Sequence, residues 1–238
     1  QRVQKKMLKD FEITWLKNVE ALPSIPLFII GNEFLDALPT KQFCRINGVW
    51  KERCVTLDEN ANLTFCNIPS KSCRKLNLSH SDVPDGKVIE ICDQATDIIS
   101  NLSSKISNNG GVAIFIDYGH YGTEGNTLQS VRNHTFNDPL KNLGKSDLTT
   151  LVNFKAIYQT AESMGLRATK PLAQGKFLKA LGIDLRLKKL TKNLSEDAKH
   201  IHVSARNRLV KEEQMGKLFK ALAFTQIDAP PLPVLENF

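Results

Sequence analysis

Two short apolar runs constrain the fold of this chain more than any other feature. The first is IPLFII at 25–30, and the second is VAIFIDYG at 112–119. Continuous runs of this length, rich in β-branched residues, are typical of strands buried on both faces. Between them, residues 88–111 show helical spacing and end in Asn-Asn-Gly-Gly, a common helix stop. This order predicts an open α/β sheet.

The middle of the chain predicts an added β element and a long connection. Residues 44–70 alternate apolar and polar side chains around an Asn-Gly pair, which predicts a β-hairpin or meander. Residues 120–146 are polar and contain several glycines without a clear period. A connection of that length typically carries functional residues, or else it contains secondary structure that the sequence pattern does not reveal.

The last third of the chain predicts helices. Residues 146–166 form an amphipathic pattern whose N-cap is expected at Ser146 or Asp147. Later segments, including EEQMGKLFKALAF at 212–224, continue the helical spacing. We therefore expect 146–238 to be a mostly helical region on the substrate side of the domain.

The net charge of +7 raises the question of nucleic-acid binding. The densest basic run, at 178–193, alternates with leucines at helical spacing, which predicts one solvated helix face. It lacks the aromatic residues of a single-strand binding platform. We therefore expect no nucleic-acid partner and assign the charge to solubility or to an acidic protein surface.

The cysteines and the hydropathy of the sequence indicate the cellular compartment in which the protein is expected. The five cysteines form no CxxC pair and have no histidine at metal-ligand spacing, so we expect reduced thiols and no metal. The apolar stretches are strand-sized, so no membrane span is expected. No secretory signal is visible, and the opening QRVQKKMLKDF is typical of the middle of a helix. We expect a cytoplasmic or mitochondrial-matrix protein that is truncated or processed.

Polar side chains follow both apolar runs. Asn32, Glu33 and Asp36 follow the first run, and Asp117 ends the second. The carboxyl ends of parallel strands share one edge, where open α/β sheets bind ligands, so these acids are expected to face one crevice. Structural roles remain open at this point. Asp36, three residues before Pro39, also suits a turn cap, and Asp117 suits a strand-end hydrogen-bond acceptor.

Six segments occur in order along nearly the whole chain: NEFLDALPTKQF, GGVAIFIDYGHYG, GNTLQSVRNHTFNDPL, GKSDLTTLVNF, QGKFLKALGI and MGKLFKAL. Together they resemble the MidA family of class I S-adenosylmethionine-dependent methyltransferases. The resemblance implies a Rossmann-like sheet and S-adenosylmethionine as cofactor. It also implies methylation of an arginine side chain in a protein substrate, such as a subunit of respiratory complex I.

Two departures from the family pattern affect what this chain can do. The family carries its glycine-rich cofactor loop in strands that lie upstream of Gln1, and Gly110 and Gly111 precede a strand instead of opening a helix. The family also has His and Asp where this chain has Leu151 and Asn153. We expect residues 1–238 to be the C-terminal two-thirds of a single catalytic domain, unable to bind the cofactor alone.

An arginine acceptor poses an electrostatic problem that the acids can solve. The sulfonium and guanidinium cations, about 4 Å apart, repel by roughly 4 kcal/mol at an effective dielectric near 20. One carboxylate would cancel most of this repulsion, and a pair, Glu33 and Asp36, could also orient the planar guanidinium. The expected site comprises catalytic Asn32, Glu33 and Asp36; cofactor-binding Asn32 and Glu33; and substrate-binding Asp117, Tyr118, His120, Gln129 and Arg132.

Two other functions remain open. The chain could be a non-catalytic assembly or binding module that keeps the methyltransferase fold, because it lacks the glycine-rich loop. Methylation of a small molecule is also compatible with the resemblance. In either case we expect an apolar sheet edge that a further segment or a second copy, forming a homodimer, must cover.

Overall fold

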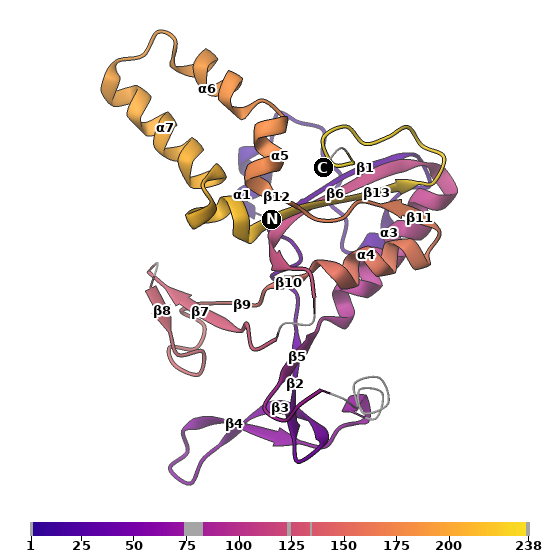
Figure 1. Ribbon diagram of the computed structural model, residues 1–238, viewed down its shortest axis with the longest axis vertical. Coiled ribbons are helices and arrows are strands. Elements are labelled where there is room, and N and C mark those ends of the chain that lie inside the picture. The colour runs from indigo at the N-terminus through magenta and orange to yellow at the C-terminus, as the bar shows by residue number, and fades with distance from the viewer. Residues whose placement is uncertain (1, 74–82, 123–124, 134, 237–238) are drawn as a thin grey trace.

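The computed structural model describes residues 2–73, 83–122, 125–133 and 135–236 (Figure 1). Its main sheet contains β1 (Leu27–Asn32), β6 (Gly111–His120), β13 (Phe219–Gln226) and β11 (Leu166–Ala168) in that order, with β10 (Val152–Asn153) beside β6 and β12 (Leu172–Ala173) beside β13. An antiparallel sheet contains β4 (Leu63–Ile68), β3 (Val49–Leu57), β2 (Lys41–Ile46) and β5 (Val88–Ile91). A three-stranded sheet contains β8 (Thr135–Asn137), β7 (Gln129–Arg132) and β9 (Asp147–Thr149).

The helices of the described residues include α1 (Arg2–Met7), η1 (Val19–Ala21), α3 (Asp93–Asn109), α4 (Phe154–Ser163), α5 (Gln174–Ala180), α6 (Ile183–Thr191), α7 (Glu196–Val210) and η2 (Glu212–Gly216). None of the helices in this part of the chain has the length and hydropathy needed to cross a bilayer.

Helices cover both faces of the main sheet. On one face, α3 and α4 pack against it through a core that includes Ile99, Phe115, Phe154 and Phe224, all at most 1% exposed. On the other face, α5 and the C-terminal segment bury a smaller cluster that includes Phe177 and the alanines of β13. Figure 1 shows α6 and α7 projecting from the sheet and the β2–β5 sheet extending at the opposite end of the molecule. The expected α/β class is confirmed.

The two predicted strands are present and pair in parallel. β1 and β6 run side by side from Leu27, opposite Gly111, to Asn32, opposite Ile116. Gly111 has a φ of +116°, and a Cβ there would lie 2.0 Å from the carbonyl oxygen of Leu27, so only glycine suits this strand start. The parallel register brings the carboxyl ends of β1 and β6 to one edge of the sheet.

The expectation that the first strand is buried on both faces is wrong. β1 lies at the edge of the main sheet, and Phe28 and Ile30 are 85% and 77% exposed. Of the alternate residues, Leu27 is buried and Ile29 packs against the α3 core. An apolar run therefore predicted the strand, but a run alone does not tell how many faces its neighbours cover.

The helical expectation for 212–224 is wrong from Phe219 onward, so 146–238 is mixed in structure. β13 lies inside the main sheet, antiparallel to β6 on one side and to β11 and β12 on the other. Its Ala and Leu residues favour helix, but differences in propensity amount to less than about 1 kcal/mol per residue, whereas both edges of its backbone are hydrogen-bonded and its centre is fully buried. Tertiary pairing therefore outweighs local propensity.

Three other boundaries differ from the predictions. The segment 88–91 is strand β5, so the helix predicted over 88–111 begins only at Asp93, although it ends before Gly110 as expected. The region 120–146 contains β7 and β8. The helix predicted from Ser146 or Asp147 begins at Phe154, and its N-cap is Asn153, whose side chain accepts two backbone N–H bonds.

The hairpin predicted around the Asn-Gly pair is present. Asn47 and Gly48 both have positive φ, at 52° and 74°, which suits a two-residue turn joining β2 and β3. β4 extends the pair into a meander, and β5 adds a fourth strand beside β2 from a later part of the chain. That the 44–70 element is an insertion in the domain stays a prediction.

Candidate functional site

A tight turn follows β1 at the shared edge. Asn32 ends the strand, and Glu33 adopts a left-handed φ of 48°, an uncommon conformation for a residue with a side chain. The backbone N–H of Glu33 still donates to the carbonyl of Ile116 at 2.9 Å. Both side chains are exposed and form no hydrogen bond to other described residues. Their predicted catalytic and cofactor-binding roles stay predictions.

The left-handed turn directs three successive backbone N–H groups toward Asp117. The N–H groups of residues 34–36 donate to its Oδ2 at 3.0–3.2 Å, and that of Tyr118 donates to its Oδ1 at 2.9 Å. Asp117 is only 1% exposed. Its carboxylate therefore organises the turn after β1, which matches the strand-end acceptor role that the sequence left open.

The pKa of Asp117 reflects competing influences. Burial raises it from the ordinary value to about 6, and the nearby carboxylate of Asp36 adds to the rise. Backbone N–H bonds oppose both effects because they stabilise the charged form. Two carboxylates therefore share one edge of the sheet, as the sequence predicted for Asp36 and Asp117.

Tyr118 connects the turn to the three-stranded sheet. Its hydroxyl forms short hydrogen bonds with Oδ2 of Asp36 and with the hydroxyl of Thr149, and its ring packs edge-on against Phe219 at 5.3 Å. Burial, followed by the bond to Asp36, raises the pKa of Tyr118 above its ordinary value. The phenol therefore stays neutral and holds one oxygen of Asp36.

The second oxygen of Asp36, Oδ1, is buried and forms no hydrogen bond within the described residues. Burying a carboxylate oxygen without a hydrogen-bond donor costs folding free energy, so such an atom commonly binds a ligand or a water molecule. Asp36 therefore presents one acceptor atom beside a second carboxylate, and a cationic group is the natural complement.

The other predicted substrate residues lie at different distances from this centre. Gln129 begins β7 directly opposite Thr149, so it neighbours the Tyr118 contact. Arg132 ends β7 opposite Thr135, is exposed, and lies away from the pair of acids. His120 is buried at the end of β6, opposite Asn153 of β10. Substrate contact by these residues stays a prediction.

A cavity of about 210 Å³ adjoins the acidic edge. It shares walls with the turn after β1 through Leu35 and with the segment after β9 through Thr150 and Leu151. Most of its lining is apolar, from β5, α3 and α4. Leu151, where the resembled family has His, thus extends the apolar wall, whereas Asn153 acts as the cap of α4.

A buried carboxylate, Glu90, joins the β2–β5 sheet to this region. It accepts hydrogen bonds from the side chain of Gln42 at 2.7 Å and from the N–H of Thr127 at 2.8 Å. The Thr127 hydroxyl in turn accepts the N–H of Leu151 at 2.9 Å. Arg53 completes the network by donating to Gln42 at 3.1 Å. Since every contact is internal, this network supports the cavity wall structurally.

S-adenosylmethionine, which the resembled family uses, needs a cradle that these residues do not supply. Gly110 caps α3 and Gly111 opens β6, so neither opens a helix, as the sequence predicted. The N–H groups of residues 34–36 are already engaged by Asp117 and cannot bind the cofactor carboxylate as well. Within the described ranges, no group of His, Cys, Asp or Glu could hold a metal. The described residues therefore supply at most part of a cofactor site, for which Asn32 and Glu33 remain the predicted contacts.

Sequence reasoning missed Thr149, Phe219 and Glu90. Thr149 lies in the DLT segment, which the sequence pattern places only in a family motif and in a predicted helix. The pattern predicts a helical tail at Phe219, although this residue packs on Tyr118 at the start of a central strand. The single acidic residue within the apolar run VIEI at 88–91 is the available signal for Glu90, whose side chain is buried in the strand.

The fold and its acidic edge define a class I methyltransferase-like α/β protein, and solved structures share this fold. A Burkholderia thailandensis structure bound to S-adenosyl-homocysteine has a TM-score of 0.80 and 28% identity over 99% of this chain and 62% of that one. A second structure from the same organism has a TM-score of 0.82 and 27% identity, and the match covers 98% of this chain and 65% of that one.

The sequence comparison narrows the class to one family. A family model described as "Putative S-adenosyl-L-methionine-dependent methyltransferase" matches residues 1–172. The chain belongs to this methyltransferase family, which confirms the kind of protein that the sequence motifs resemble.

Curated relatives agree with this assignment. "Protein arginine methyltransferase NDUFAF7, mitochondrial" of Xenopus tropicalis is 33% identical over 217 residues, which are 88% of this chain and 49% of the relative. The protein of the same name in Homo sapiens is 31% identical over 214 residues, which are 89% of this chain and 48% of the relative. The chain thus spans about half the length of the curated relatives it matches.

Proposed function

We propose that this chain forms the acceptor side of an S-adenosylmethionine-dependent methyltransferase that modifies an arginine side chain of a protein. The observation that carries the proposal is the buried Oδ1 of Asp36, which has no hydrogen-bond partner among the residues the structure describes and lies next to the second carboxylate of Asp117. The names of the relatives, protein arginine methyltransferases, support an arginine acceptor.

The chain's own residues would act by binding and neutralisation. Asp36 would accept a guanidinium N–H through Oδ1 while Tyr118 holds Oδ2, which fixes the plane of the carboxylate. Asp117 would keep the turn after β1 in place and add negative potential. When bound, S-adenosylmethionine supplies the methyl group, and the acids lower the cost of placing an arginine beside its sulfonium charge.

The location and the substrate are finer parts of this proposal. The relatives' names support a mitochondrial location. A substrate in respiratory complex I, or a bacterial cytoplasmic location, is proposed from the family resemblance of the sequence motifs. We also propose that the exposed residues of β1, Phe28 and Ile30, are covered by a further segment or by a second copy, since an apolar edge strand left open favours aggregation.

Methyl transfer to arginine-containing protein substrates tests the proposal. In the protein that carries these residues, we expect Asp36→Asn to lower turnover about a thousandfold, because roughly 4 kcal/mol of charge neutralisation is lost. Radiolabelled methyl transfer and methylarginine analysis of the product measure it. Asp10→Asn, at an exposed position, is the matched control. Unchanged turnover in Asp36→Asn would assign Asp36 a structural role.

A second candidate function, a non-catalytic assembly module, is favoured by one observation. The described residues provide no glycine-rich turn that opens a helix. We expect calorimetry to detect no S-adenosylmethionine binding by residues 1–238 alone and clear binding by a longer polypeptide. A longer polypeptide that also fails to bind the cofactor would favour the assembly module.

A further inference from the structure

The positive charge of this protein is concentrated in one part of the fold. Residues 174–220, here called the basic arm, contain twelve Lys or Arg and five Asp or Glu, a net charge of +7. The whole chain also has a net charge of +7, so the remaining residues, with twenty basic and twenty acidic side chains, are neutral overall. Such segregation has a physical consequence, because a neutral body exerts little field while the arm exerts a strong one.

Within the basic arm, α6 and α7 stand away from the core. α6 buries none of its residues, and α7 buries only Val210. The two helices pack on each other, and Arg206 of α7 reaches Asp184 of α6 at 2.7 Å to hold the pair together. Figure 1 shows this helical pair projecting from the main sheet, opposite the β2–β5 sheet.

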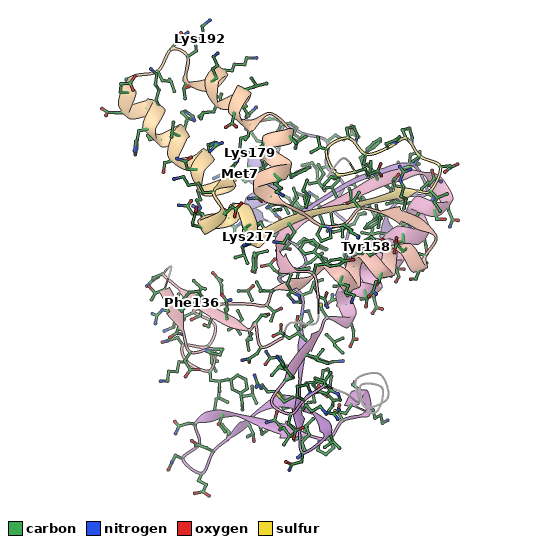
Figure 2. The ribbon with its side chains drawn as sticks, viewed as in Figure 1. Met7, Phe136, Tyr158, Lys179, Lys192 and Lys217 are labelled. Carbon is green, nitrogen blue, oxygen red and sulfur yellow. The ribbon has the colours of Figure 1, made fainter. Side chains whose placement is uncertain are left out.

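The outward side of α6 combines cationic and aliphatic groups. Leu185, Lys188, Lys189 and Lys192 follow one another at helical intervals, so they form a stripe along one side of the helix and its end. All four are exposed, and Leu185 has 75% of its surface open to solvent. In Figure 2, Lys192 lies at the far end of the arm and points outward.

Leu181 and Ile201 add further exposed aliphatic surface to the arm, at 59% and 69%. An exposed leucine among lysines gains nothing from contact with a nucleic-acid backbone, which offers phosphates but no apolar layer. A bilayer surface offers both anionic headgroups and an acyl boundary, which matches lysines whose stems lie along apolar surface. The lysines and the exposed aliphatic side chains of the arm therefore both favour an anionic lipid surface as the partner.

We propose that the outward stripe of α6 docks the protein peripherally on an anionic phospholipid surface. Lys188, Lys189 and Lys192 contact the phosphate groups, and Leu185 enters the boundary between headgroups and acyl chains. The neutral body remains in the aqueous phase. The inference is independent of the methyltransferase activity, since it uses no residue of the acidic edge.

Vesicle binding tests the docking surface without any methyl donor. We expect the protein to co-sediment with phosphatidylcholine vesicles that contain about one-third phosphatidylglycerol and not to bind vesicles of pure phosphatidylcholine. The bound protein should dissociate as the salt concentration is raised. Equal binding to both vesicle types, or none to either, would overturn the proposal.

Charge removal distinguishes the arm from the protein's other lysines. The triple change Lys188→Gln, Lys189→Gln and Lys192→Gln should weaken partitioning about a hundredfold, because each lysine near the surface contributes roughly fivefold. Changing Lys5, Lys6 and Lys9 to Gln, also exposed, removes the same charge elsewhere and should have little effect. Equal losses in the two triple variants would overturn the assignment to α6. Thermal unfolding of both variants checks that they fold.

The leucine distinguishes a lipid surface from an acidic protein. Leu185→Ser should lower vesicle partitioning several-fold without changing its salt dependence, whereas Leu143→Ser, 62% exposed in a loop, should not. If polyglutamate binds the protein as tightly as the vesicles do, and Leu185→Ser changes neither, the arm serves an acidic polypeptide and the lipid proposal fails.

Discussion

The acidic edge at β1 and β6 and the basic arm both carry charged side chains, but the fold treats these charges in opposite ways. At the edge, Asp117 is fully buried and receives four backbone N–H bonds. In the arm, the lysines of α6 remain exposed. A buried charge needs partners that position it, whereas an exposed charge acts through its field. The edge is therefore suited to orienting a reacting group, and the arm to steering association.

If the acidic edge at β1 and β6 depends on close packing, one added methyl group there should lower the free energy of unfolding. Gly119 of β6 lies so close to β10 that a Cβ would sit 2.2 Å from the carbonyl oxygen of Val152. We expect Gly119→Ala to lower the free energy of unfolding by about 3 kcal/mol in urea titrations. Gly122→Ala, where a Cβ meets nothing within 4 Å, should be nearly neutral. Equal costs would contradict the packing argument.

The cap of α4 offers a second measure of how firmly the edge is built. Asn153 accepts the N–H groups of Lys155 and Ala156 at 3.1 and 3.3 Å. Asn153→Ala should lower the unfolding free energy by about 1–2 kcal/mol, while Asn153→Asp should restore the cap at little cost. If urea titration finds the two variants equally destabilised, the residue has a role other than capping.

The raised pKa of Asp117 predicts a pH dependence that the arm should lack. Because the folded pKa of about 6 exceeds the unfolded value, this residue contributes stability at low pH that is lost as pH rises through 6. Between pH 5 and 7 the unfolding free energy of the wild type should fall by about 1 kcal/mol relative to Asp117→Asn. Parallel pH profiles of the two proteins in urea titrations would mean that Asp117 titrates normally.

The smallest effect is expected in the arm. Lys189→Gln removes an exposed charge that has no partner among the described residues and should change the unfolding free energy by less than about 0.5 kcal/mol. Thermal unfolding at low and high salt measures this. A larger loss would show that the arm, like the edge, uses its charges to hold the fold together.

The outcome at particular residues explains how far sequence reasoning reached. It placed Asp36 and Asp117 at one edge correctly, because parallel strands must bring their carboxyl ends together. It did not foresee that Asp117 would be engaged by the turn at Glu33, since a left-handed φ at a glutamate has no sequence signature. It assigned Phe219 to a helix because Ala and Leu favour helices locally.

By itself, the sequence determined the local elements of this protein: the two parallel strands, the helix stopped by Gly110, and the turn at Asn47 and Gly48. Each depends on periodicity or on backbone freedom that neighbouring residues carry with them. Only the tertiary structure decided that β1 is an edge strand, that β13 is a central one, and that Oδ1 of Asp36 has no hydrogen-bond partner in the described part of the chain. Those features depend on which distant segments complete a sheet or donate a hydrogen bond, and local sequence does not contain that information.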